Sequence, residues 1–272
     1  MPELPEVETT RLGLLPLLNQ SVSKVVIRNE SLRWPIPQFI VETLPQQKLN
    51  ALTRRAKYIL AHFDHGVLLL HLGMSGRLRL LAQDEPPIKH DHFDILFNDG
   101  QVLRLNDPRR FGAVLWAGAE PYSHKLLSVL GPEPLDEAFT GHYLHRQMRT
   151  RTSAVKITIM DSHLVVGVGN IYASESLFRA RIHPQSPAKS ISLEDCNRLV
   201  AAIKSTLHDA LAAGGSSLRN FLSVDGSPGY FQQAYFVYAR TGLPCKVCHS
   251  LIKNVRLGQR STFYCDSCQP IK

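Results

Sequence analysis

The chain has 272 residues and a formal charge of +8, with 31 lysines and arginines against 23 aspartates and glutamates. Hydrophobic residues make up 44% of the chain, which excludes an intrinsically disordered protein because enough apolar surface is available to bury. The charge favours a polyanionic partner such as nucleic acid, although a basic protein that only stays soluble would have the same charge.

The first six residues, MPELPE, are acidic and contain two prolines. A secretory signal would instead start with a basic stretch followed by an apolar one. No run in the chain approaches the roughly 18–20 apolar residues of a membrane-spanning helix. We therefore expect a cytoplasmic protein with no membrane partner.

Pro2 is the most unusual feature of this start. Removal of the initiator methionine, which is normal before a small residue, would give Pro2 a terminal secondary amine. Such an amine can attack an aldehyde-level carbon to form an iminium ion, an electron sink that drives elimination. Glu3 stands beside it as a candidate general acid or base. The alternative is that these residues only start a helix, which apolar spacing predicts over residues 6–18.

Residues 1 to about 120 are β-rich after that helix. Turn signals at residues 64–66 (DHG) and 98–100 (NDG) each separate two short apolar runs, as in β-hairpins. The predicted strands are residues 23–27, 58–63, 67–72, 93–97 and 101–105. Repeated hairpins predict an antiparallel sandwich or barrel.

Basic residues flank these hairpins. Residues 54–57 (RRAK) precede a strand, and residues 107–112 (DPRRFG) combine a turn, two arginines and an aromatic residue. An exposed aromatic residue beside an arginine can wedge between bases while the guanidinium holds a phosphate. Met74 lies in a similar loop between two glycines. Taken singly, Met74 and Phe111 could equally be packed against a core.

The second half of the chain has a helical pattern after a rigid connector at residues 131–134 (GPEP). Ser192 starts a capping box, and apolar residues then follow helical spacing until Gly214 and Gly215 end the helix. Cys196 falls on the apolar face of this helix and is interpreted as a core residue. Another helix is predicted to start at Asn170, after a glycine-containing turn.

Four of the five cysteines form two C-x2-C pairs separated by 16 residues. This spacing is typical of a zinc site in which two tight turns supply four thiolates and leave no position for a catalytic water. The alternatives are two disulfides or four unrelated thiols, and disulfides are not expected without a signal peptide. We predict one structural zinc ion bound by Cys245, Cys248, Cys265 and Cys268.

Residues 253–264, between the cysteine pairs, predict two short strands around a glycine turn. The cysteines therefore belong to a β-hairpin zinc finger. Arg260 lies just after the turn, where its side chain either reaches a phosphate or stays solvated.

The motifs together resemble the bacterial formamidopyrimidine-DNA glycosylases, which are 8-oxoguanine DNA glycosylases with AP lyase activity. The resemblance runs from Pro2 to Cys268 and rests on segments that occur in the family's order. These are residues 2–9 (PELPEVET), 71–76 (HLGMSG), 107–112 (DPRRFG), 166–173 (VGVGNIYA), 228–233 (PGYFQQ) and 258–260 (GQR).

The resemblance implies that duplex DNA binds between an N-terminal β-sandwich and a helix–two-turn–helix domain with a C-terminal zinc finger. We accordingly expect an α+β chain with a catalytic β-sandwich domain at residues 1–130. A helical domain follows at residues 131–235 and a zinc finger at residues 236–272. The expected partner is double-stranded DNA containing oxidised purines or abasic sites, bound by a monomer at the nucleoid.

The resemblance also implies a mechanism, in which Pro2 attacks C1′ of the damaged nucleoside and forms an imino intermediate. Glu3 is the general acid that helps open the sugar, and β- and δ-elimination then cut the strand on both sides. The implied catalytic residues are Pro2, Glu3, Lys57 and Arg260. The implied DNA-binding residues are His71, Met74, His90, Arg109, Phe111, Lys156, Asn170 and Tyr238.

A base inside a duplex must be flipped out before a nucleophile can reach its sugar. By the resemblance, Met74, Arg109 and Phe111 fill the gap that the flipped base leaves. Residues 217–230 correspond to the loop that covers the everted purine. Lys57 binds phosphate and assists catalysis, while Lys156 lies near the lesion.

The sequence departs from the family pattern at three places, with Ile159 for leucine, Ala239 for glycine and residues 216–220 (SSLRN) for TTLRD. The last two concern base preference and not the chemistry. One alternative is the sister endonuclease VIII group, which prefers oxidised pyrimidines but typically has glycine where this chain has Leu4. Residues 215–231 also fit the purine-specific group. The other alternative is a zinc-finger protein that binds DNA without catalysis.

Overall fold

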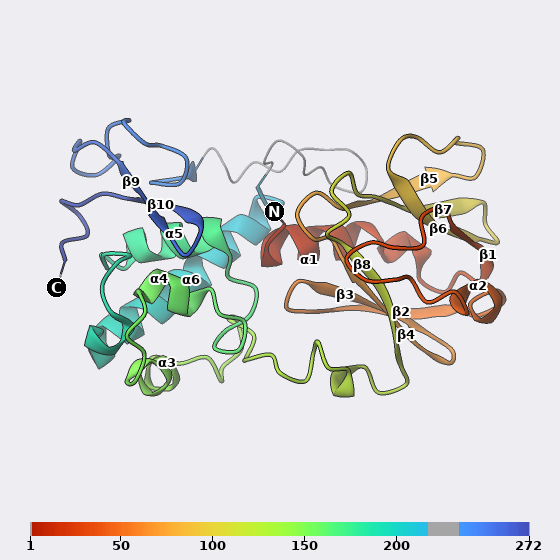
Figure 1. Ribbon diagram of the computed structural model, residues 1–272, viewed down its shortest axis with the longest axis horizontal. Helices are drawn as coiled ribbons and strands as arrows, with labels where there is room; N and C mark the ends of the chain where they lie inside the picture. Colours follow the sequence, from red (N-terminus) through yellow and green to blue (C-terminus); the bar gives the residue numbers. More distant parts are fainter. Residues whose placement is uncertain (1, 217–233, 272) are drawn as a thin grey trace. The chain divides into compact units, whose positions relative to one another are not determined.

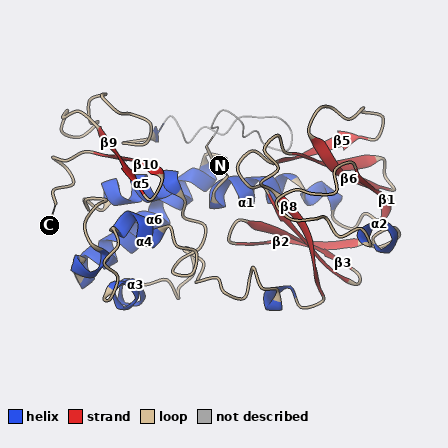
Figure 2. Cartoon of the chain, in the orientation of Figure 1, coloured by secondary structure: helices blue, strands red, loops and turns tan. Residues whose placement is uncertain are grey.

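The computed structural model describes residues 2–216 and 234–271, which form two compact units (Figure 1). Among these residues, 2–128 and 213–216 belong to the first unit, and 129–212 and 234–271 to the second. The first unit is mainly strands, and the second mainly helices with one short hairpin (Figure 2).

The first unit contains two four-stranded antiparallel sheets. One has the order β1 (Val22–Ile27), β6 (Asp91–Phe97), β7 (Gln101–Asn106) and β5 (Arg77–Ala82). The other has the order β2 (Leu49–Arg55), β3 (Tyr58–Phe63), β4 (Gly66–His71) and β8 (Ala113–Gly118). The unit also contains α1 (Leu4–Gly13), α2 (Ile40–Thr43) and the 3-10 turns η1 (Leu15–Leu17) and η2 (Pro121–Ser123).

A single hydrophobic cluster lies between these sheets. Alternate residues of β6, such as Phe93 and Ile95, join Leu68 and Leu70 of β4 in it, as period-2 alternation along a strand requires. This packing confirms the predicted antiparallel sandwich. The N-terminal helix differs from the prediction because it spans Leu4–Gly13 and not residues 6–18. Pro16 has no N–H to donate to the preceding turn of an α-helix, so the α-helix ends and the chain continues in the 3-10 turn η1.

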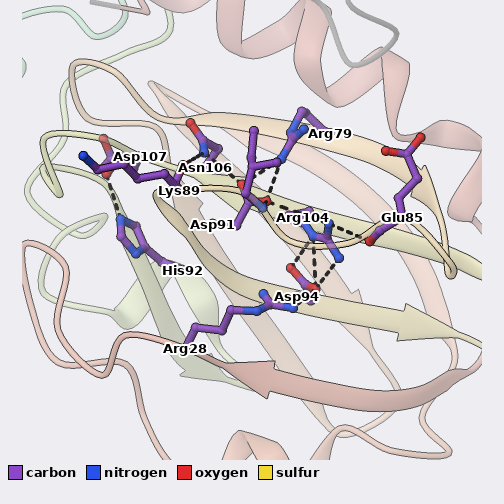
Figure 3. A network of polar contacts seen from close by, with 11 residues as sticks. Arg28, Arg79, Glu85, Lys89, Asp91, His92, Asp94, Arg104, Asn106 and Asp107 are labelled. Carbon is purple, nitrogen blue, oxygen red and sulfur yellow. Dashed lines mark hydrogen bonds and ion pairs between the residues drawn. The ribbon is translucent and has the colours of Figure 1, made fainter.

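The face of the first sheet opposite this cluster carries buried charged side chains (Figure 3). Arg104 of β7 donates to both carboxylate oxygens of Asp94 on β6 at 2.9–3.1 Å, and its Nη1 reaches the Glu85 carbonyl at 3.0 Å. Asn106 donates to the Lys89 carbonyl at 3.0 Å. The network therefore fastens residues 85–89 over the sheet, with each buried charge paired as burial demands.

The second unit contains helices, a 3-10 turn and a hairpin: α3 (Gly141–Met148), α4 (Val155–Ile159), α5 (Asn170–Arg179), η3 (Ala188–Ser190), α6 (Leu193–Ala212), β9 (Lys253–Leu257) and β10 (Arg260–Tyr264). Helix α6 starts where predicted, since the Ser192 hydroxyl accepts the Asp195 N–H at 3.1 Å. Cys196 is fully buried on its inner face, which confirms the core interpretation. Helix α5 starts at Asn170 as predicted.

The finger and the helices of the second unit share one apolar cluster. Phe178 of α5 packs with Val237, Ile252 and the two buried cysteines Cys245 and Cys265. The Gln269 side chain donates to the Ile182 carbonyl at 2.8 Å and accepts the Cys265 N–H at 3.0 Å. The finger is thus fixed to the helical part by both apolar packing and hydrogen bonds.

Candidate active site and nucleic-acid interface

Pro2 and Glu3 are buried at the start of α1. Glu3 is the N-cap of this helix and forms a reciprocal capping box with Glu6, whose Oε2 accepts the Glu3 N–H at 2.8 Å. The structure therefore contains the helix start that was the alternative interpretation. It also places the Glu3 carboxyl at the positive end of a helix, where it accepts the Glu6 N–H and where a carboxylate is favoured.

The second carboxylate oxygen of Glu6 joins the chain start to a distant segment. Its Oε1 accepts the Ser216 N–H at 2.8 Å, and Glu6 is only 2% exposed. A Cβ on Gly215, which has φ +81°, would lie 3.2 Å from this oxygen. Both carboxylate oxygens of Glu6 thus accept backbone N–H groups. From the sequence, only the closeness of Glu6 to Pro2 along the chain could be seen.

Lys57 lies in the two-residue turn that joins β2 and β3, beside Ala56 with φ +54°. The next residue, Tyr58, pairs with His71 across β3 and β4, and their rings are 4.8 Å apart. Burial and, after it, the positive charges of Lys57 and Arg33 together lower the pKa of His71 to about 4. Lys57 and His71 are thus brought together, with His71 neutral at physiological pH.

The tautomer of this neutral imidazole follows from its hydrogen bond. The Gly73 N–H donates to His71 Nδ1 at 3.1 Å, so Nδ1 is the acceptor and the proton resides on Nε2. A neutral Nε2–H can still donate to a phosphate oxygen. Elsewhere in the basic segment 54–57, Arg54 donates to Glu8 of α1 at 3.1 Å and so stabilises the unit internally.

Met74, Arg109 and Phe111 lie in two loops of the first unit. Met74 is half-buried between β4 and β5, whereas Arg109 and Phe111 are exposed between β7 and β8. The Arg109 guanidinium lies 4.8 Å from the centre of the Phe111 ring, and Phe111 is 44% exposed. His90 is half-buried with φ +73°, and its ring lies 6.2 Å from that of His92.

In the second unit, Lys156 of α4 is fully buried. Its Nζ donates to Asn170 Oδ1 at 2.6 Å, to Thr262 Oγ1 at 2.7 Å and to the Ser261 carbonyl at 3.1 Å. Asn170 Nδ2 donates to the same Ser261 carbonyl at 3.0 Å. Lys156 and Asn170 are thus brought together against β10, and the buried ammonium positions the asparagine. Direct contact of Lys156 with DNA stays a prediction.

Tyr238 lies between the helices and the finger, with its ring 4.9 Å from that of Phe263 on β10. Its N–H and those of Phe236 and Val237 all donate to the carboxylate of Glu175, at 2.8–3.0 Å. Burial raises the pKa of Glu175, although the three N–H bonds oppose this. Glu175 was not among the residues singled out from the sequence. The available signal was an acidic residue within a helix that is mostly buried.

Arg260 is the first residue of β10 and is half-buried. It follows a turn in which Gly258 and Gln259 both have positive φ, +49° and +63°, as in the tight hairpin turns that match strand twist. A Cβ on Gly258 would lie 2.9 Å from Ile157 Cδ1, so the turn approaches α4 closely. The predicted covering loop, residues 217–230, lies outside the described residues.

The four cysteines of the two pairs converge. Their sulfur atoms lie within 4.8 Å of one another, with Cys245 and Cys268 at 3.9 Å and Cys248 and Cys265 at 3.4 Å. Sulfurs bound tetrahedrally at about 2.3 Å from zinc are themselves just under 4 Å apart, so this donor set fits zinc. The Val247 N–H donates to Cys245 Sγ at 3.4 Å, as expected for a thiolate in a tight metal-binding turn.

Comparison with known proteins identifies the family. The N-terminal domain model of formamidopyrimidine-DNA glycosylase matches residues 1–114, and the H2TH domain model matches residues 130–222. A zinc finger found in FPG and IleRS matches residues 242–271. The formamidopyrimidine-DNA glycosylase of Methylobacillus flagellatus is 63% identical over 269 residues, covering 99% of this chain and 96% of the relative. This chain belongs to the formamidopyrimidine-DNA glycosylase family. The formamidopyrimidine-DNA glycosylase of Herminiimonas arsenicoxydans is 54% identical to this chain, and the alignment covers 99% of this chain and 100% of the relative.

Solved structures of the family have the same fold. The MutM (Fpg) protein of Thermus thermophilus aligns with a TM-score of 0.89 and 36% identity, over the whole of both chains. A Lactococcus lactis Fpg variant in complex with DNA containing Fapy-dG aligns with a TM-score of 0.93 and 31% identity, covering 99% and 100%. The same enzyme with abasic DNA gives a TM-score of 0.92 and 30% identity, covering 98% and 99%.

The family membership fixes the class of enzyme. As a member of this family, the chain is a bifunctional base-excision DNA glycosylase and AP lyase that binds DNA. Its finger holds one structural zinc ion on Cys245, Cys248, Cys265 and Cys268. Within residues 2–216 and 234–271, no helix is both long and apolar enough to span a membrane.

Proposed function

We propose that this enzyme removes 8-oxoguanine and formamidopyrimidines from duplex DNA and cuts the strand through an imino intermediate on Pro2. The supporting observation is the start of α1, where the capping box with Glu6 fixes Glu3 beside Pro2. The Lactococcus lactis enzyme was solved with DNA containing Fapy-dG and with abasic DNA, which supports the same substrate class here.

The proposed reaction begins once Met1 has been removed. The lone pair of the Pro2 nitrogen forms a bond to C1′, and the bond from C1′ to the damaged base breaks, with its electron pair leaving on the base. The proton that the Pro2 nitrogen then loses neutralises the departing base. Opening of the sugar ring moves the electron pair to O4′, which takes a proton from Glu3, and leaves an iminium ion at C1′. No further proton is needed for this cation, because the amine is secondary.

The iminium ion then acts as the electron sink for strand cleavage. Loss of a C2′ proton breaks the C3′–O3′ bond, and loss of a C4′ proton breaks the C5′–O5′ bond, so a phosphate leaves at each step. Water finally hydrolyses the imine and releases Pro2. The positive end of α1 disfavours the protonated amine, which keeps the nucleophile available at neutral pH.

The remaining predicted residues hold the DNA. Lys57 and the Nε2–H of His71 bind phosphates from the first unit, and Asn170, Tyr238 and Arg260 bind them from the second. Lys156 keeps Asn170 in place through its 2.6 Å hydrogen bond. The zinc ion stabilises the hairpin that carries Arg260 and takes no part in the chemistry, since four thiolates fill its coordination shell.

Met74, Arg109 and Phe111 occupy the gap left by the flipped base, with the Arg109 guanidinium stacked on the Phe111 ring. His90 also binds the DNA. The functional division follows residues 1–130, 131–235 and 236–272, and the enzyme acts as a monomer on chromosomal DNA at the nucleoid.

Cleavage of matched duplexes tests the substrate class. Strands containing 8-oxoguanine or dihydrothymine are compared under single-turnover conditions, with an undamaged duplex as the control. We expect faster release of 8-oxoguanine, and borohydride should trap the enzyme covalently on the same strand. A strong preference for dihydrothymine would overturn the purine assignment, and the lack of any trapped adduct would overturn the imino mechanism.

A further inference from the structure

Two loops of the first unit pass side by side from one sheet of the sandwich to the other. Residues 72–76 lead from β4 to β5, and residues 107–112 lead from β7 back to β8. Because β5 pairs with β7 and β4 with β8, both loops start and end on neighbouring strands. The first loop carries Met74, and the second carries Arg109 and Phe111.

Asp107 joins these two loops from inside the protein, where it is fully buried. Its Oδ1 accepts the Ser75 hydroxyl at 2.6 Å, and its Oδ2 accepts the Gly112 N–H at 2.7 Å. The Ser75 oxygen in turn accepts the Arg109 N–H at 3.1 Å. The loop of Arg109 and Phe111 is thus held near both of its ends, and one of these attachments passes through the loop of Met74.

The backbone of Asp107 attaches a third segment. Its N–H donates to the His90 carbonyl at 3.0 Å, and its own carbonyl lies 2.9 Å from His92 Nε2 (Figure 3). The same carbonyl accepts the Arg110 N–H at 3.2 Å, which closes the turn at the tip of the loop. Three segments with predicted DNA-binding residues therefore converge on one aspartate.

Backbone packing leaves these loops little freedom to shift. Gly73 has φ +60°, and a Cβ there would lie 2.3 Å from the Phe111 carbonyl carbon. A Cβ on Gly112 would lie 2.8 Å from the His71 carbonyl oxygen. Contacts this close hold the two loops against each other, so a displacement of one loop is transmitted to the other.

We propose that Asp107 and Ser75 are positioning residues that hold Met74, Arg109 and Phe111 as one preformed wedge. The three side chains then enter the base stack together when the damaged nucleotide is flipped. The inference rests on the proposed function and specifies how its gap-filling residues are aligned. The pair contacts no reacting atom, so it affects eversion of the base and not the attack by Pro2.

The substitution Ser75→Ala tests the proposal, because it removes the donor to Asp107 and the acceptor for Arg109 N–H. On an 8-oxoguanine duplex we expect the single-turnover rate constant to fall about tenfold, which is less than the roughly 100-fold that a misplacement of 1 Å can cost. On a single-stranded abasic oligonucleotide, which needs no eversion, borohydride trapping should stay within about twofold of wild type. With 2-aminopurine placed opposite the lesion, its change in fluorescence should be slower for Ser75→Ala than for wild type, because the wedge is inserted more slowly.

Asp107→Asn is the second variant, since it keeps the size of the side chain and one acceptor while it removes the carboxylate charge. It should show the same selective loss on the duplex. Ser123→Ala is the matched control, because the exposed Ser123 hydroxyl donates to the carbonyl of Glu120 in its own turn. The control should match wild type on both substrates.

The outcomes separate the proposal from the function on which it rests. Wild-type duplex rates in Ser75→Ala and Asp107→Asn would overturn the positioning role while the trapping of wild type stays intact. Equal losses on duplex and single strand would also overturn it, because the defect would then not concern eversion. Failure of wild type itself to be trapped would instead reject the Pro2 mechanism.

Discussion

The Nζ atom of Lys156 lies 2.6 Å from Oδ1 of Asn170, inside the second unit and away from solvent. The same ammonium reaches two groups of β10, so one buried cation connects α4, the start of α5 and the zinc-finger hairpin. A family lysine expected to act near the lesion thus also maintains the relative positions of Asn170 and the strand that begins with Arg260.

Lys156→Met should therefore destabilise the second unit, because it leaves Asn170 Oδ1 and Thr262 Oγ1 without their donor. Each buried polar group left unsatisfied costs about 1–3 kcal/mol. Urea unfolding of the zinc-loaded protein measures the loss. Lys204→Met is the control, since its Nζ makes a solvent-exposed hydrogen bond to the Asp136 carbonyl, and it should change stability by less than about 0.5 kcal/mol. Equal stabilities of the two variants would refute the account.

The titration of His71 gives a second prediction. Burial first, and then the charges of Lys57 and Arg33, lower the pKa of this group to about 4. Its folded pKa lies below the unfolded value near 6.5, so neutral His71 stabilises the protein above pH 6.5. That contribution is lost as the pH falls from 6.5 through 4.

Histidine NMR signals followed between pH 3 and 8 should place His71 near 4. In Lys57→Met the midpoint should rise, because one repelling charge is gone, while in the exposed-residue control Lys24→Met it should not move. A midpoint near 6.5 in wild type would contradict the buried, neutral imidazole.

Arg104 is the subject of a third prediction. Its guanidinium is 4% exposed and holds Asp94 at 2.9 Å on the outer face of the first sheet. Arg104→Met leaves buried carboxylates with fewer partners, and breaking a buried pair in this way costs about 3–5 kcal/mol. Thermal unfolding measures the loss, with exposed Arg149→Met as the control. A loss as small as that of the control would show that the network contributes little.

At Ala239 we expect a substitution that increases the stability of the protein. Its φ is +57°, in the left-handed region that costs a residue with a Cβ about 1–2 kcal/mol. Ala239→Gly should therefore stabilise the second unit, by about 0.5–1 kcal/mol after the greater entropy of glycine in the unfolded chain is subtracted. Ala180→Gly, at φ −77°, should instead destabilise. Stabilisation by both or by neither would exclude the conformational explanation.

Local patterns predicted much of this molecule. Alternating apolar residues and hairpin turns placed the strands of the sandwich, and helical spacing after Ser192 placed α6, because these signals depend on neighbours in sequence. The C-x2-C pairs predicted the metal site for the same reason. Apolar spacing alone extends the predicted N-terminal helix to residue 18, whereas the observed α-helix ends at Gly13, before Pro16.

Contacts between distant residues could not be predicted in this way. Glu6 accepts the N–H of Ser216, and Glu175 accepts three N–H groups more than 60 residues further on. No periodic pattern in the sequence links residues so far apart along the chain, because only the folded structure brings them together. The family resemblance supplied roles for Lys57, Asn170 and Arg260, but the residues that position them became visible only in three dimensions.

Mass spectrometry of the trapped complex tests most directly whether the Pro2 nitrogen is the nucleophile. The enzyme is reduced with borohydride on an 8-oxoguanine duplex and digested, and the modified peptide is sequenced. The account predicts a chain that starts at Pro2 and carries the reduced sugar fragment on its terminal nitrogen. A fragment on a lysine such as Lys57, or on any other residue, would contradict it.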